Sequence, residues 1–273
     1  MTTPKCAVSD TKDWCGTFDK LPGDLVEAAL TLLYKKNITP LIPWGSLLFR
    51  RLNVPKVLLD FQFLVPDELL SSASDMVSTT MHLPLTSPPS LLVETQGDLI
   101  TKGRLHRLTR AATLGSVQFL HLVPLSFAGP FLPSELTEER HETYTLSIPR
   151  PSAVYASLLR IIASCPRGDC PTRRSLGAEL ELLVNYHLLG LPMGYRVPAE
   201  DDDEAWDALD LDGRAERAVC TVRGWGVEGE WREGEGWMQD ALVSILRGTG
   251  DIDYLPWTDR STMTSPRSQY HLC

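Results

Sequence analysis

The sequence predicts an α+β fold with an α/β core, in which a mixed sheet is flanked by helices and followed by a C-terminal helical region. Three observations support this prediction. The first third alternates helical and extended patterns, and a proline-bounded apolar run at 56–65 is typical of a central strand. After residue 150, apolar residues recur mainly at helical spacing. Elements in this order form layers around one core.

The first elements follow from local patterns. Residues 23–37 combine a capping Asp24 with apolar residues at helical spacing, which predicts the first helix. The segment TPLIPW is expected to be extended because each proline disfavours helix in the residue before it. A short helix over 45–53 then precedes the strand at 56–65.

A further helix is expected over 67–80, directly after the central strand. Proline, glycine and serine then divide the chain into short apolar runs. These runs predict strands at 90–94, 103–110 and 116–124.

The second half is predicted to be helical. Apolar stripes at spacings of three and four predict helices over 152–165, 172–190 and 238–248. The acidic stretch 198–213 is interpreted as a solvated linker or an exposed helix face, since it lacks the ligand spacing of a calcium loop. The Gly- and Trp-rich stretch 224–237 is expected to be a loop.

The domain organisation follows from these patterns. The chain is divided into a flexible arm at 1–22, an α/β core at 23–133, a helical region packed on that core at 134–260 and a flexible tail at 261–273. No internal repeat is evident.

Composition restricts the function classes. A net charge of −9 over 273 residues provides no general basic field for a phosphate backbone, so nucleic acid is not expected as a partner. The six cysteines are scattered, and the pair in CPRGDC is too widely spaced for a CxxC motif, which predicts free thiols. No apolar segment is long enough to span a membrane and the N-terminus lacks a signal-peptide pattern, so a cytoplasmic location is expected.

One sequence motif suggests a functional site. Trp44, Gly45 and Ser46 open the short helix, and the central strand then carries Asp60 and, two residues later, Gln62. A Gly-Ser pair followed at this distance by D-x-D on a strand resembles the nucleotidyltransferase-like superfamily. Here Gln62 stands at the place of the second aspartate, so the motif is degraded to D-x-Q. The wider pattern, with the later IPRPSAVYASLLRIIASC, resembles a divergent fungal branch of that superfamily and implies its fold.

The substitution at Gln62 changes what the site can bind. Strand alternation places residues 60 and 62 on one face, where two carboxylates could share metal ions. A glutamine supplies an oxygen without charge, and magnesium prefers carboxylate, water and phosphate ligands. We therefore expect no metal site and no cofactor.

His121 and several aromatic residues complete the candidate site. The resemblance places a third acidic or histidine position at His121, which we expect to be either a catalytic polar group beside Asp60 and Gln62 or an ordinary half-buried histidine. Candidate substrate-binding residues are Trp44, Gly45, Ser46, Phe119, Trp225 and Trp237. The tryptophans could line an apolar pocket or simply pack the C-terminal segment.

A literal D-x-D at Asp251 and Asp253 is not assigned a metal role. It follows the end of a predicted helix, without a Gly-Ser pair at the required distance and without a strand-like run. A capped helix end followed by a loop is predicted there.

Two functions from different classes remain. The first is a metal- and cofactor-independent small-molecule enzyme, such as a cyclase or pericyclase of Diels–Alderase type in fungal secondary metabolism. It would act on an apolar substrate through folding and hydrogen bonding. The second is a catalytically inactive nucleotide-binding pseudoenzyme or interaction module. Magnesium-dependent ATP binding distinguishes them.

Overall fold

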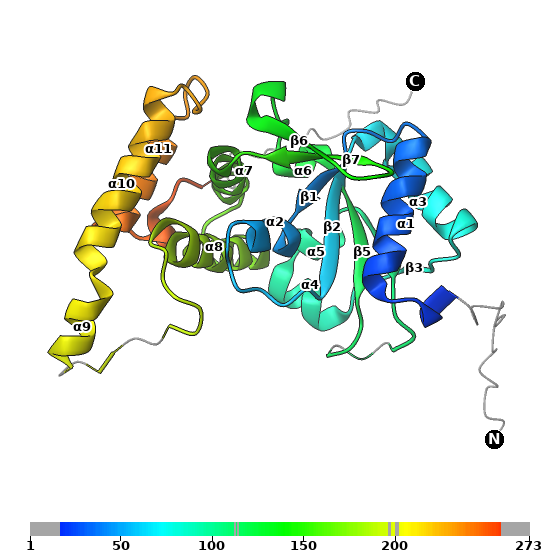
Figure 1. Ribbon diagram of the computed structural model, residues 1–273, viewed down its shortest axis with the longest axis horizontal. Coiled ribbons are helices and arrows are strands. Elements are labelled where there is room, and N and C mark those ends of the chain that lie inside the picture. The colour runs from blue at the N-terminus through cyan, green and yellow to red at the C-terminus, as the bar shows by residue number, and fades with distance from the viewer. Residues whose placement is uncertain (1–16, 112, 114, 196–197, 200–201, 258–273) are drawn as a thin grey trace, which may run out of the picture.

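The protein has the predicted α+β architecture, a mixed five-stranded sheet flanked by helices with a helical C-terminal region (Figure 1). The computed structural model describes residues 17–111, 113, 115–195, 198–199 and 202–257. The two segments expected to be flexible, 1–22 and 261–273, lie largely or wholly outside these residues.

The sheet has the order β1-β2-β5-β4-β3. Strands β2 and β5 pair in parallel and form its centre, and the other neighbours are antiparallel. A separate hairpin is formed by β6 and β7. The strands are β1 (Ile42–Trp44), β2 (Asp60–Val65), β3 (Leu85–Thr86), β4 (Arg104–Arg107), β5 (Phe119–Pro124), β6 (Leu136–Arg140) and β7 (Thr145–Pro149).

Helices cover both faces of the sheet. The helices of the described residues are α1 (Pro22–Lys35), α2 (Ser46–Arg51), α3 (Leu70–Thr80), α4 (Ser90–Gln96), α5 (Asp98–Thr101), α6 (Leu125–Ala128), α7 (Pro151–Ser164), α8 (Pro171–Leu183), α9 (Asp203–Leu209), α10 (Leu211–Val227) and α11 (Gly236–Leu246). A π-helical turn, Val184–Leu188, continues α8.

The alternation of side chains along β2 separates two apolar cores. Phe63 and Val65 point to one face, where they pack with buried residues of α1 and α3. Leu64 points to the other face and packs with α7 and α8. Asp60 and Gln62 share the face of Leu64, so they lie between the sheet and the α7–α8 layer.

The expected strand at 90–94 is wrong, because these residues form helix α4. Pro89 precedes the helix in an extended conformation, and Gly97 with φ 56° ends it. A run with three consecutive apolar residues is too short for its period to distinguish the two structures. Prolines before a helix and a left-handed glycine after it are the usual boundary signals.

The region 134–260 also differs from a purely helical one. It begins with the β6–β7 hairpin, whose Ser147 N–H donates to Leu41 O at 3.0 Å beside β1. The stretch expected to be a loop, 224–237, starts as the last turn of α10 and ends as the first of α11. Valine and alanine on the buried side of α10 extend the helix through Gly224 and Gly226.

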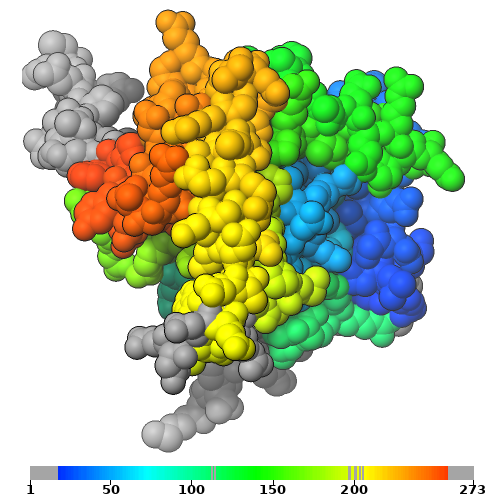
Figure 2. Space-filling model, turned by 60° about the vertical axis from the view of Figure 1, so that its left-hand side comes forward, coloured from blue at the N-terminus to red at the C-terminus, as the bar shows by residue number. Residues whose placement is uncertain are grey.

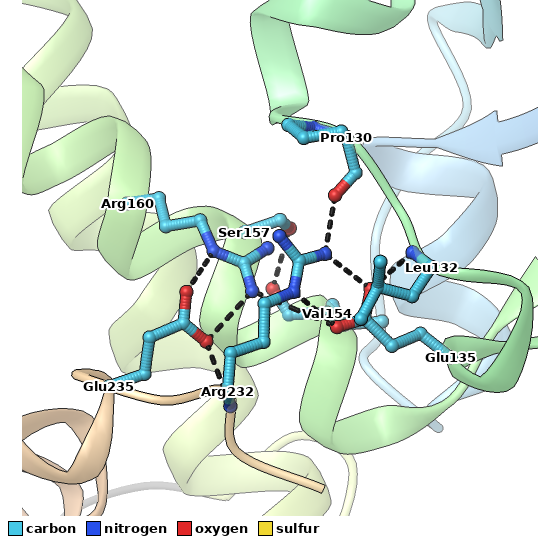
Figure 3. Close-up of polar contacts among 8 residues, drawn as sticks. All are labelled: Pro130, Leu132, Glu135, Val154, Ser157, Arg160, Arg232 and Glu235. Atoms are coloured by element: carbon cyan, nitrogen blue, oxygen red, sulfur yellow. Dashed lines mark hydrogen bonds and ion pairs between the residues drawn. The ribbon is translucent and has the colours of Figure 1, made fainter.

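Helices α10 and α11 form a ridge along one side of the molecule (Figures 1 and 2). The loop between them is fixed to α7 and to the turn before β6 by four charged residues, Glu135, Arg160, Arg232 and Glu235 (Figure 3). Within the described residues, no helix has both the length and the apolar character needed to cross a bilayer.

Candidate functional site

Five of the predicted site residues line one cavity of about 170 Å³ between the sheet and α4, α5 and α8. They are Gly45, Ser46, Asp60, Gln62 and Phe119. We call this cavity the Asp60 cleft. Its apolar wall includes Leu99, Ile100 and Val117, and its polar members are Ser46, Lys56, Asp60, Gln62, Gln96 and Glu179.

Gly45 shapes the wall of the cleft beside Gln62. Its φ of 56° and ψ of −136° are accessible to glycine and strained for residues with a side chain. A Cβ at this position would also collide with Oε1 of Gln62. The Gly-Ser turn and the strand residue at 62 therefore pack directly against one another.

Asp60 and Gln62 are joined by a hydrogen bond. The amide Nε2 of Gln62 donates to Oδ2 of Asp60 at 2.5 Å. Burial raises the pKa of Asp60, and the bond from Gln62 and the charge of Lys56 partly oppose this rise. The carboxyl group thus favours its neutral form more than an exposed aspartate does.

Lys56 and Glu179 also belong to the cleft. Lys56 Nζ donates to Glu179 Oε1 at 2.8 Å, and the ammonium lies 5.2 Å from the ring centroid of Phe49. Burial raises the pKa of Glu179, the Lys56 charge and hydrogen bond lower it, and the Asp60 charge raises it again. The cleft therefore holds two interacting carboxyl groups and one cation.

Sequence patterns had not identified Lys56, Gln96 or Glu179. Glu179 did leave a signal, because it lies within the apolar stripe of α8 between Leu176 and Leu183. Lys56 begins the predicted strand segment four residues before Asp60. The sequence does not indicate that these two distant residues contact each other.

The donor set does not fit the metal site implied by the nucleotidyltransferase-like resemblance. One oxygen of Asp60 accepts from Gln62, and the nearby positive charge is the ammonium of Lys56. Among the residues described, no three His, Cys, Asp or Glu side chains come together as a metal-binding set. The arrangement is instead a hydrogen-bonding one, in which Lys56 supplies the countercharge.

Two polar groups of the cleft have hydrogen-bonding capacity left. The side chains of Ser46 and Gln96 line the cavity without a hydrogen-bond partner in the described part of the chain. A hydroxyl group and a carboxamide can each donate and accept. Together with Asp60, they can bind the polar group of a ligand whose remainder contacts the apolar wall.

His121 lies in register with Gln62 on the neighbouring strand, but it is fully buried and does not line the cleft. Its Nε2 lies 2.7 Å from Lys102 O, so that nitrogen carries the proton and donates. Burial lowers its pKa to about 4. Its Nδ1 has no hydrogen-bond partner in the described structure. The geometry favours a neutral core histidine over a catalytic group.

The three candidate tryptophans are also outside the cleft. Trp44 is buried and meets Phe131 edge-on, with ring centroids 6.3 Å apart. Trp225 of α10 packs against Tyr155 and Trp231, and Trp237 of α11 packs against the same core. These two tryptophans therefore stabilise the docking of the C-terminal helices.

Asp251 and Asp253 form a local cap, but at the start of a short turn and not at the end of the preceding helix. The carboxylate of Asp251 accepts from the N–H of Asp253 at 2.9 Å at the start of a single 3₁₀ turn, Ile252–Tyr254. Neither residue lines the Asp60 cleft.

Comparison with known proteins does not assign this chain to a family. No family model, curated protein or solved structure matches the chain. The interpretation of the Asp60 cleft depends on its own residues.

Proposed function

We propose that this chain is a metal- and cofactor-independent small-molecule enzyme of the cyclase or isomerase class, built on a degenerate nucleotidyltransferase-like scaffold. The observation that carries the proposal is the hydrogen bond from Gln62 to Asp60 beside the Lys56–Glu179 pair, in a cleft with an apolar wall. This set of groups can bind a polar substituent and transfer a proton. It does so without a metal ion.

The dimensions of the cleft indicate the size of the bound moiety. A volume of about 170 Å³ matches a single ring, since an apolar cavity of about 150 Å³ holds benzene. Val57 and Leu59 line the same cavity and are 78% and 45% exposed. A larger apolar substrate would place one ring or chain end inside and its remainder over these two residues.

The chemistry follows from the polar groups that face the ligand. Donors such as Ser46 and Gln96 can polarise a carbonyl group, and Asp60, whose pKa is raised by burial, can exchange a proton with the substrate. Hydrogen bonds that strengthen as charge develops lower the barrier of a ring closure or a proton shift. Folding the substrate against the apolar wall supplies the remaining gain through proximity.

Phenol is a probe of this site because it combines one ring with one hydroxyl donor. We expect titration of the ¹⁵N-labelled full chain, with EDTA present, to give saturable amide shifts at Asp60, Gln62, Leu99 and Phe119. Asp60→Asn removes a charged acceptor and should weaken binding about tenfold, the effect of a charge-assisted hydrogen bond.

Glu68→Gln is the matched control, because Glu68 is exposed just beyond the other end of β2. It should leave the phenol affinity unchanged. Shifts that are scattered over the surface, or that require added magnesium, would contradict the proposed site.

A further inference from the structure

The turn between α7 and α8 brings two cysteines together. Cys165 directly follows α7 and Cys170 directly precedes α8, so each caps one helix. The intervening turn contains Gly168 with φ 95°, and the N–H of Cys170 donates to Gly168 O at 2.8 Å. This tight turn reverses the chain between the helices.

The two thiol groups lie at the two ends of one short turn and line the same cavity. The charge of Cys170 contributes to the raised pKa of Cys165, as expected for neighbouring groups. Both residues line a cavity of about 650 Å³ whose wall also includes Lys102 and Ser126. Cys165 is buried, whereas Cys170 is half-buried and is the more accessible of the two.

We propose that Cys165 and Cys170 are a modification site that forms a reversible intramolecular disulfide, with a low-molecular-weight disulfide such as oxidised glutathione as the oxidant. The proposal is independent of the function assigned to the Asp60 cleft. It depends on the short turn that holds the two cysteines between α7 and α8 and on the access of both to one cavity.

The exchange takes two balanced steps. The Cys170 thiolate attacks one sulfur of the oxidant, forms a mixed disulfide and releases one molecule of the reduced thiol. The Cys165 thiolate then attacks the Cys170 sulfur and releases the second. Two cysteine thiols lose two electrons and two protons, and the oxidant gains both.

The order of attack follows from exposure and charge. An external oxidant reaches Cys170 more easily because Cys165 is buried. Burial, and then the charge and hydrogen bond of Cys170, raise the pKa of Cys165 to about 12. A Cys170 that is part of a mixed disulfide carries no charge and no longer raises the pKa of Cys165. The lower pKa of Cys165 favours the second step.

The disulfide would fix the start of a helix that reaches the Asp60 cleft. Thr172, two residues after Cys170, accepts a hydrogen bond from the Asp98 N–H at 2.8 Å at the start of α5. Glu179 lies nine residues beyond Cys170 on the same helix, roughly 13 Å along its axis. Oxidation would therefore constrain α8, the helix that places Glu179 in the Asp60 cleft.

Trypsin provides a direct test because Arg167 lies inside the turn. The folded full-length chain is incubated with oxidised glutathione, alkylated, digested and analysed by mass spectrometry without reduction. We expect residues 161–167 and 168–173 as one disulfide-linked species that separates after reduction. Cys165→Ser should instead leave glutathione attached to Cys170, and exposed Cys220 serves as the internal reference for an unpaired thiol.

Two results would overturn the proposal. One is a persistent glutathione adduct on Cys170 in the unsubstituted protein, with Cys165 still alkylated. The other is unmodified Cys165 and Cys170 under conditions in which Cys220 has reacted. A third measurement repeats the reaction in denaturant, where we expect the linked species to form several-fold more slowly because the folded turn no longer holds the two cysteines together.

Discussion

Asp60 shows how a single residue can serve a site at the expense of stability. Burial raises its pKa in the folded protein above that of an unfolded aspartate, near 3.9. The folded state then binds the proton more tightly, so stability is highest below the unfolded pKa and falls as pH rises through the folded value. Above the folded pKa, the ionised carboxylate of Asp60 is a destabilising group.

Asp60→Asn should therefore raise the thermal midpoint at pH 7, while the same substitution weakens ligand binding. Asparagine can still accept the hydrogen bond from Gln62 through its carbonyl oxygen. The gain should shrink as the pH is lowered through the raised folded pKa of Asp60, because the wild-type carboxyl group then becomes protonated. A lower midpoint at pH 7 would show that Asp60 is a structural carboxylate instead.

The buried His121 should change stability with pH in the opposite direction to Asp60. Its folded pKa of about 4 lies below the unfolded value near 6.5, so the unfolded chain binds the proton first. Its contribution is fully present above pH 6.5 and is lost as pH falls through 4. Over that window it amounts to on the order of 3 kcal/mol of unfolding free energy.

His121→Gln tests this assignment through urea denaturation between pH 4 and 7. The variant should lose less stability on acidification than the wild type does. Some dependence should remain, because burial also lowers the pKa of His106 and His187. His82→Asn, at an exposed position, is the control, and parallel curves for wild type and His121→Gln would contradict a buried neutral histidine.

At the scale of elements, the charged cluster of Figure 3 joins three segments distant in sequence. Arg232 donates to both oxygens of Glu135 and to Pro130 O, and Arg160 donates to both oxygens of Glu235. Burial alone would raise the pKa of Glu135, but the bonds from Arg232 and from the Leu132 N–H hold it below the usual value. The cluster fixes the α10–α11 loop to the core.

Arg232→Met should lower the free energy of unfolding by on the order of 3 kcal/mol, because Glu135 is then buried without its main partner. Arg247→Met removes an exposed bidentate contact with Glu216 and should cost less than about 1 kcal/mol. Chemical denaturation compares the two. Equal losses would show that burial of the Glu135 pair does not contribute.

Elements with a long or strongly bounded pattern were predictable from the sequence. The strand containing Asp60 and the helices α1, α7 and α8 follow from proline boundaries and helical spacing. The run 90–94 was not predictable, because its three consecutive apolar residues fit the period of a helix or of a strand. The continuation of α10 through Gly224 and Gly226 depends on its packing against the core, which local propensity does not contain.

At the scale of the whole molecule, the Asp60 cleft combines local and distant residues. Gly45, Ser46, Asp60 and Gln62 lie within 18 positions, and their spacing predicted their proximity. Lys56 and Glu179 are 123 residues apart and meet only because α8 packs on the sheet. Tertiary packing therefore determined the countercharge of the cleft, and the same packing placed Trp225 and Trp237 elsewhere.

The central claim is that Lys56 and Gln62 replace metal coordination around Asp60. Calorimetric titration of ATP into the full chain, with and without magnesium, tests it most directly. We predict no saturable binding in the wild type under either condition, and the appearance of magnesium-dependent heat only in a Gln62→Asp, Lys56→Met variant. Magnesium-dependent ATP binding by the wild type at micromolar concentration, lost in Asp60→Ala, would contradict the claim and favour a nucleotide-binding protein.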